Sequence, residues 1–197
     1  ANPIEACANA LEHFALEECV KRSRFNHSVS ALVTPAGNCD TAFKLAHVGA
    51  QVIVGDQSER RQEIEGRILA RGLREEIRFA EFTLGQSVDT LTGEPFDIIV
   101  VRRGLCVLPY AEAQNVLRRL LKMLKIGGKL YVSVLGIHSE LGEGYSAGEK
   151  PIGERFAPLA PAMAEKYGLH TPLCLYSERN LFMLLLEIGA SVLRTLT

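Results

Sequence analysis

Hydrophobic and polar positions follow one another in blocks that predict helices and strands in turn. Apolar residues recur at helical spacing over 3–21, and short apolar runs predict six strands at 30–35, 51–56, 76–82, 95–101, 129–135 and 190–196. The blocks between the strands predict helices at 41–49, 58–72, 111–125 and 177–188. Strand–helix alternation with continuously apolar strands predicts an α/β fold, a doubly wound and mostly parallel sheet with helices on both faces.

The length of 197 residues fits one domain with a substantial core. We expect residues 1–29 to form an N-terminal helical extension and residues 30–197 to form the α/β domain. A long stretch with several glycines and prolines, at about 136–176, follows the fifth strand and predicts an insertion at that point.

Composition narrows the possible functions. Lys and Arg total 22 against 23 Asp and Glu, so the net charge of -1 provides no basic surface for general nucleic-acid binding. No apolar run approaches the roughly 18 residues of a membrane span, and acidic residues interrupt the apolar N-terminal stretch, unlike a signal peptide. We therefore expect a small-molecule substrate, no nucleic-acid or membrane partner and an unspecified oligomeric state.

Cysteine and histidine usage indicates the compartment and the absence of a metal site. The five cysteines are scattered and odd in number, without a Cys-x-x-Cys motif, and the five histidines lack the spacing of metal ligands. This pattern favours a reducing cytoplasmic location and no metal.

Ligand-binding residues are expected where the first strand gives way to its helix. In a doubly wound sheet the ligand lies beyond the carboxyl ends of the strands, at the point where strand order reverses. The turn at 35–40 carries a single glycine, Gly37, and Asp56 ends the second strand 19 residues later. An acid at that position can accept hydrogen bonds from both hydroxyls of a ribose, although it also suits a helix entry.

Three segments resemble one known family. They are GAQVIVGDQS at 49–58, the run from PFDIIVV to KLYVSVL at 95–135, and YSERNLFMLLLEIGASVLR at 176–194. Their order and spacing are similar to the class I S-adenosylmethionine-dependent methyltransferases, over residues 30–196. The resemblance implies a Rossmann-like fold, S-adenosylmethionine as cofactor and Asp56 as the ribose-binding acid.

The resemblance also implies which residues line the cofactor site: Pro35, Ala36, Gly37, Asn38, Asp56, Gln57, Phe82, Thr83 and Arg102. The chain departs from the family pattern in the first strand and turn. The family's first-strand acid falls at Val33, and its glycines fall at Pro35, Gly37 and Cys39. The family's final antiparallel strand would follow residue 196, so we expect the sequence to be short by one strand.

Two further features have open interpretations. Arg102 and Arg103 end the fourth strand. Both could clamp a carboxylate of the ligand, or strand alternation could direct one arginine into solvent and the other toward a neighbouring glutamate. The insertion contains side chains that could act as a base, but a loop position alone does not distinguish them from packed or solvated residues. We therefore nominate no catalytic residue among His138, Tyr145, Tyr167 and His170.

Methyl transfer from S-adenosylmethionine to a small-molecule acceptor is the leading hypothesis. Transfer from a sulfonium needs alignment rather than a metal or a covalent nucleophile. The alternative is a methyltransferase-like domain that no longer binds the cofactor and acts as a binding or interaction module. A nicotinamide-dependent oxidoreductase fits less well, because a pyrophosphate requires a stricter glycine turn.

Overall fold

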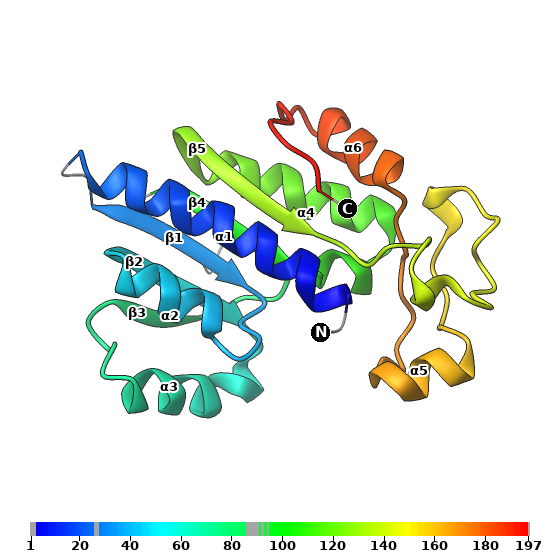
Figure 1. The fold of residues 1–197 in the computed structure, drawn as a ribbon, viewed down its shortest axis with the longest axis horizontal. Helices are drawn as coiled ribbons and strands as arrows, with labels where there is room; N and C mark the ends of the chain where they lie inside the picture. Colours follow the sequence, from blue (N-terminus) through cyan, green and yellow to red (C-terminus); the bar gives the residue numbers. More distant parts are fainter. Residues whose placement is uncertain (1–2, 26–27, 86–90, 92, 94, 197) are drawn as a thin grey trace.

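The computed structural model describes residues 3–25, 28–85, 91, 93 and 95–196 (Figure 1). Five strands and six α-helices are assigned among these residues, and helices separate most consecutive strands. The helices are α1 (Pro3–Ser23), α2 (Asp40–His47), α3 (Arg61–Ala70), α4 (Tyr110–Lys122), α5 (Pro161–Tyr167) and α6 (Glu178–Glu187). The strands are β1 (Val29–Thr34), β2 (Ala50–Asp56), β3 (Ile77–Glu81), β4 (Phe96–Arg102) and β5 (Leu124–Ser133).

The strands form one parallel sheet in the order β3-β2-β1-β4-β5. Strand order reverses between β1 and β4, whose register pairs Leu32 with Ile99 and Thr34 with Val101. The predicted doubly wound architecture is therefore confirmed, and so is the predicted switch point between the first and fourth strands.

Helices cover both faces because the side chains of the central strands alternate between two cores. Ala31 and Val33 of β1 join a core with residues of α1, α2 and α3, whereas Leu32 joins a second core with α4, α6 and the 136–176 segment. Figure 1 shows α1 and α2 on one side of the sheet and α4 on the other. The long N-terminal helix packs directly along β4 and β5.

The fifth strand begins earlier than the sequence predicts. Helix α4 ends at Lys122 rather than at 125, and Leu124 already pairs with Phe96 of β4. The pairing then shifts, so that Ile98 lies opposite Lys129, and Gly127 and Gly128 form an irregularity within β5 instead of a turn before it. Gly127 has a φ of 77°, a backbone conformation that glycine adopts without strain.

The predicted sixth strand at 190–196 is wrong. Helix α6 begins at the predicted cap, Ser177, whose side chain accepts a hydrogen bond from the Asn180 N–H. After Gly189 the segment 190–196 has no strand assignment, because no described strand pairs with its backbone. A segment with an apolar strand pattern forms a strand only where a neighbouring strand completes the ladder of hydrogen bonds.

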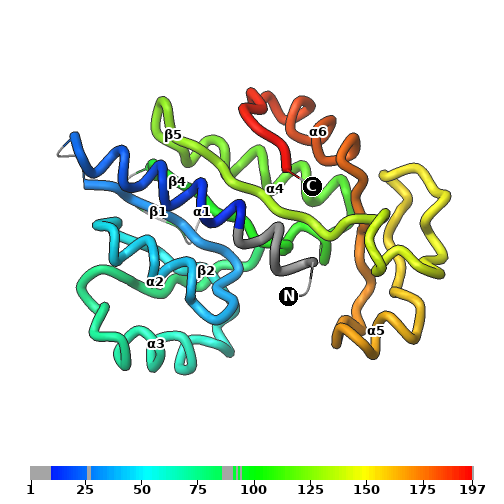
Figure 2. Tube along the Cα trace, viewed as in Figure 1, coloured from blue at the N-terminus to red at the C-terminus, as the bar shows by residue number. Residues whose placement is uncertain are grey.

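The 136–176 segment leaves the carboxyl end of β5, loops outward and returns to α6 (Figure 2). It contains α5 and two short 3-10 turns, Glu140–Gly142 and Ile152–Glu154. Over the part of the chain that is described, no helix has both the length and the apolar content needed to cross a membrane.

Candidate functional site

The candidate site lies at the carboxyl ends of β1, β2 and β4. The turn after β1 begins with a cis peptide bond between Thr34 and Pro35, and the Cys39 N–H donates to the Ala36 carbonyl at 2.9 Å. Gly37 and Cys39 have φ values of 54° and 68°. An added Cβ at Gly37 would meet no atom within 4 Å, so this glycine serves the turn geometry rather than close packing.

Asp56 ends β2 and ties this turn to the second strand. Its Oδ2 accepts a hydrogen bond from the Ala36 N–H at 2.9 Å, and its Oδ1 accepts from the Gln57 N–H at 2.8 Å. The residue is 6% exposed. A nearly buried carboxylate thus lies against the turn that follows β1.

Arg60 makes a third contact to Asp56 that sequence reasoning missed. Its Nη1 donates to Asp56 Oδ2 at 2.9 Å, and its Nη2 donates to the Gly37 carbonyl at 2.8 Å. The Nε and Nη2 atoms of Arg60 also lie 3.2 Å from the Glu63 carboxylate. The sequence carried no direct signal for this contact, because Asp56 ends a strand and Arg60 ends a 3-10 turn, so the four-residue spacing of an α-helix does not apply.

The β3 side of the site is filled by apolar side chains. Phe82 is 1% exposed, and its ring lies against Gly55, where an added Cβ would be 3.0 Å from the Phe82 Cδ1. An added Cβ at Gly104 would overlap Leu84 and lie 2.9 Å from the Pro35 Cδ. Phe82 and Pro35 therefore pack closely against neighbouring residues of the protein. Thr83, next to Phe82, is half-buried.

Arg102 points to the helical layer rather than outward from the sheet edge. Its Nη1 donates to Thr41 Oγ1 at 3.1 Å and lies 3.9 Å from Glu12 Oε2. Thr41 in turn donates to Glu12 Oε2 at 2.6 Å, and Lys44 pairs with the same carboxylate. Of the two interpretations left open above, the pairing with a neighbouring acid is what the structure contains.

Glu12 is the buried centre of this network. Burial raises the pKa of the Glu12 carboxyl, but hydrogen bonds from Lys44 and Thr41 outweigh it and hold the pKa below its ordinary value. The network fastens α1 to the first turn of α2 and to the end of β4. Arg103, the neighbour of Arg102, has a φ of 56° and donates its N–H to the Ser133 carbonyl at 2.8 Å.

The insertion does not bring its four candidate bases together at the switch point. Tyr145 is buried and donates to the Leu173 carbonyl at 2.6 Å, and Tyr167 donates to Glu140, which also pairs with Lys166. His138 and His170 are exposed. Among the described residues, no cluster of three or more His, Cys, Asp or Glu side chains is placed to hold a metal ion.

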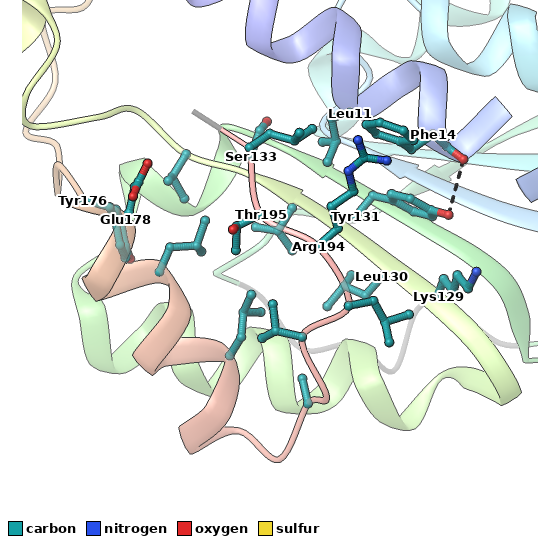
Figure 3. Close-up of a pocket in the computed structure, with 18 of the residues that line it drawn as sticks. Leu11, Phe14, Lys129, Leu130, Tyr131, Ser133, Tyr176, Glu178, Arg194 and Thr195 are labelled. Carbon is teal, nitrogen blue, oxygen red and sulfur yellow. Dashed lines mark hydrogen bonds between the residues drawn. The ribbon is translucent and has the colours of Figure 1, made fainter. Parts of the chain in front are cut away.

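A large groove lies elsewhere, along the outer edge of β5. It has a volume of about 1810 Å³ and is lined by α1, β5, α6 and the 190–196 segment. Figure 3 shows Leu11 and Phe14 of α1 on one side, Tyr131 of β5 beside them and Arg194 reaching toward Phe14. None of the nine predicted cofactor-site residues lines this groove. The sequence analysis did not predict the groove itself.

Comparison with known proteins shows similarity of structure but not of sequence. No protein-family model matches the chain, and no curated protein matches it. An O-methyltransferase family protein from Burkholderia thailandensis superposes with a TM-score of 0.63 at 15% identity, covering 98% of this chain and 56% of that one. Mitomycin 7-O-methyltransferase also superposes with a TM-score of 0.63 at 15% identity, and the superposition covers 92% of this chain and 49% of that one.

A [4+2]-cyclase is equally similar, with a TM-score of 0.63, 18% identity, and 93% and 58% of the two chains covered. The chain therefore spans about half the length of these structures. At such identities the similarity shows the fold, and it confirms the predicted Rossmann-like methyltransferase fold. The presence of a cyclase among proteins of this fold illustrates that the reaction depends on the site and not on the fold.

Proposed function

We propose that this chain is the cofactor-binding domain of an S-adenosylmethionine-dependent methyltransferase that acts on a small-molecule acceptor. The observation that carries the proposal is Asp56, a nearly buried carboxylate at the carboxyl end of β2 and against the turn after β1. A carboxylate at this place in a doubly wound sheet suits the two hydroxyls of a ribose. The fold and the order of the three similar segments support the same conclusion.

The residues present fit the ribose end of the cofactor better than its methionine end. Asp56 supplies acceptor atoms for a diol, and Gln57 and Asn38 are exposed beside it. Val33, at the position of the family's first-strand acid, is 1% exposed and has no polar side-chain atom for an ammonium group. When bound, the cofactor supplies an activated methyl group on a sulfonium.

The protein's part in such a reaction is to orient the two reactants and exclude water. Asp56 and the turn at 35–37 would hold the nucleoside end, and the 136–176 segment, which starts at the carboxyl end of β5, would cover the acceptor. We assign no proton transfer, because no described histidine or tyrosine of the insertion lies among the residues around Asp56.

A binding module without methyl transfer is the second candidate. It is favoured by the apolar filling around Phe82, Leu84 and Gly104 and by the absence of a polar side chain at Val33. The two candidates share the fold and differ in whether the nucleoside and methyl donor bind.

Thermal unfolding with S-adenosylhomocysteine separates them. Ligand at a hundred times Kd adds about 2.7 kcal/mol, which raises the Tm of a domain of this size by about 5–10 °C. We expect Asp56→Asn to remove most of that shift and Asp40→Asn, an exposed acid at the same sheet edge, to retain it. If millimolar ligand left the Tm unchanged, this result would contradict the methyltransferase proposal, and the binding module would remain as the candidate function.

A further inference from the structure

The carboxylate of Asp56 is already largely engaged within the protein. A carboxylate has about four lone-pair positions, and three hydrogen bonds use them: from the Ala36 N–H, the Gln57 N–H and the Arg60 guanidinium. A diol that binds through both hydroxyls needs two positions. With Arg60 in place only one remains, so the diol and Arg60 compete for the same oxygen, Oδ2.

Arg60 also closes the space between β2 and the turn after β1. Its Nη2 bonds the Gly37 carbonyl, so the guanidinium bridges the two segments that a nucleoside would contact. Arg60 belongs to the short 3-10 turn Ser58–Arg60 that leads from β2 to α3. The arginine therefore lies across the candidate site and not beside it.

The guanidinium has a second anchor that would persist if it left Asp56. Glu63, on the first turn of α3, lies 3.2 Å from both the Nε and the Nη2 of Arg60. Glu63 is half exposed, and the side chain of Arg60 is 32% exposed. A rotation that gives up Asp56 and the Gly37 carbonyl can therefore keep one ion pair while the guanidinium turns toward water.

We infer that Arg60 is a displaceable cap on the ligand site: it occupies Asp56 in the free protein, and it releases Asp56 while keeping its ion pair with Glu63 when a diol ligand binds. The inference rests on the proposed function, because it assumes that Asp56 receives a nucleoside ribose. A cap lowers the apparent affinity by the fraction of molecules in which the site is open. If the cap is closed about nine-tenths of the time, its removal strengthens binding about tenfold.

The test is isothermal titration of S-adenosylhomocysteine into the wild type, Arg60→Ala, Arg60→Gln and the control Arg61→Ala. Arg61 is the next residue and carries the same charge, but it pairs with Glu65 and stacks on Phe79 at 4.5 Å without contacting Asp56. We expect both Arg60 variants to bind about tenfold more tightly and the control to bind like the wild type. Two substitutions of different size guard against one that fails to fold, which circular dichroism would reveal.

Adenosine and 2′,3′-dideoxyadenosine provide the decisive pair of ligands. Because the cap competes with hydroxyl groups for the Asp56 oxygens, Arg60→Ala should strengthen binding of adenosine more than binding of the dideoxy compound. An equal gain for both would show that Arg60 does not compete with hydroxyl groups for Asp56, and it would overturn the cap.

The remaining outcomes distinguish the cap from the function on which it rests. Equal affinity of the wild type and both Arg60 variants for S-adenosylhomocysteine would overturn the cap and leave the proposed function standing. Binding by the Arg60 variants alone would show that Arg60 is a fixed block that the ligand does not displace, and it would contradict both the displaceable cap and the proposed function. No binding by any variant at millimolar ligand would overturn both.

Discussion

The carboxyl ends of the three central strands and the outer edge of β5 are built differently. Around β1, β2 and β4 the switch point is closed, because Leu84, Pro35 and Gly104 are in close contact and Asp56 and Glu12 each have several hydrogen-bond partners. Beside β5 the chain leaves a groove of about 1810 Å³, and the 190–196 segment crosses it without a strand ladder. The edge where the fold predicts a ligand is thus tightly packed, and the open space lies where the sheet ends.

This difference shows that the position of a site in the fold and the volume of a cavity are separate kinds of information. Position in a doubly wound sheet directs attention to Asp56, whereas cavity size alone directs it to the groove. The groove borders an edge strand, which has one row of backbone groups without a strand partner among the described residues. The groove lies at that edge and not at the switch point, so we base the proposed function on Asp56.

The largest expected effect comes from shortening one leucine on each side of this comparison. Leu32 of β1 is fully buried, and Leu130 of β5 is half-buried. We expect Leu32→Ala to lower the free energy of unfolding by about 2–5 kcal/mol and Leu130→Ala by about 1 kcal/mol. Chemical denaturation measures both values. Equal losses would mean that the β5 side is as tightly packed in solution as the switch point.

The central architecture could be predicted from the sequence because buried parallel strands leave an unmistakable pattern. Runs such as 51–56 and 95–101 are mostly apolar, and they became β2 and β4 with bounds shifted by one residue. The last run, at 190–196, is similarly apolar but has no strand partner. A strand is a property of two segments, so one segment's pattern could not reveal this failure.

The candidate site was predicted only in outline. The position of Asp56 follows from the end of a strand, but its partner Arg60 and the pairing of Arg102 with Glu12 depend on side-chain directions. Glu12 lies 90 residues from Arg102 in the sequence, and only the packing of α1 on the sheet brings them together. The filling of the β3 side by Leu84 likewise depends on the shape of the folded loop.

A smaller effect is expected from adding a methyl group to one glycine on each side. A Cβ at Gly104 would overlap Leu84 and approach Pro35, whereas a Cβ at Gly136, in the lining of the groove, would meet nothing within 4 Å. We expect Gly104→Ala to destabilise the protein by about 1–3 kcal/mol and Gly136→Ala to change its stability by less than about 0.5 kcal/mol. Thermal unfolding measures both changes in stability. A Gly104→Ala variant as stable as the wild type would mean that the switch point is less tightly packed than the structure indicates.

The smallest effect concerns two acids on opposite sides of α1. Glu12 faces the switch point and bonds Thr41 and Lys44, while Glu17 lines the groove, is exposed and pairs with His13 at 3.0 Å. We expect Glu12→Gln to cost about 1–2 kcal/mol at pH 7, and Glu17→Gln to cost less than about 0.5 kcal/mol. Denaturation at several pH values measures both.

The pH dependence of the Glu12 effect has a definite sign. Despite the opposing effect of burial, Lys44 and Thr41 hold the pKa of Glu12 below its ordinary value in the folded protein. A carboxyl with a lowered folded pKa stabilises the protein above its unfolded pKa of about 4.3 and loses that contribution as the pH falls through its folded pKa. The gap between the wild type and Glu12→Gln should therefore be full at pH 7 and shrink below about pH 4. A gap that stays constant with pH would show that Glu12 acts through shape rather than charge, and a gap as small as that of Glu17→Gln would remove the electrostatic contrast between the two sides of α1.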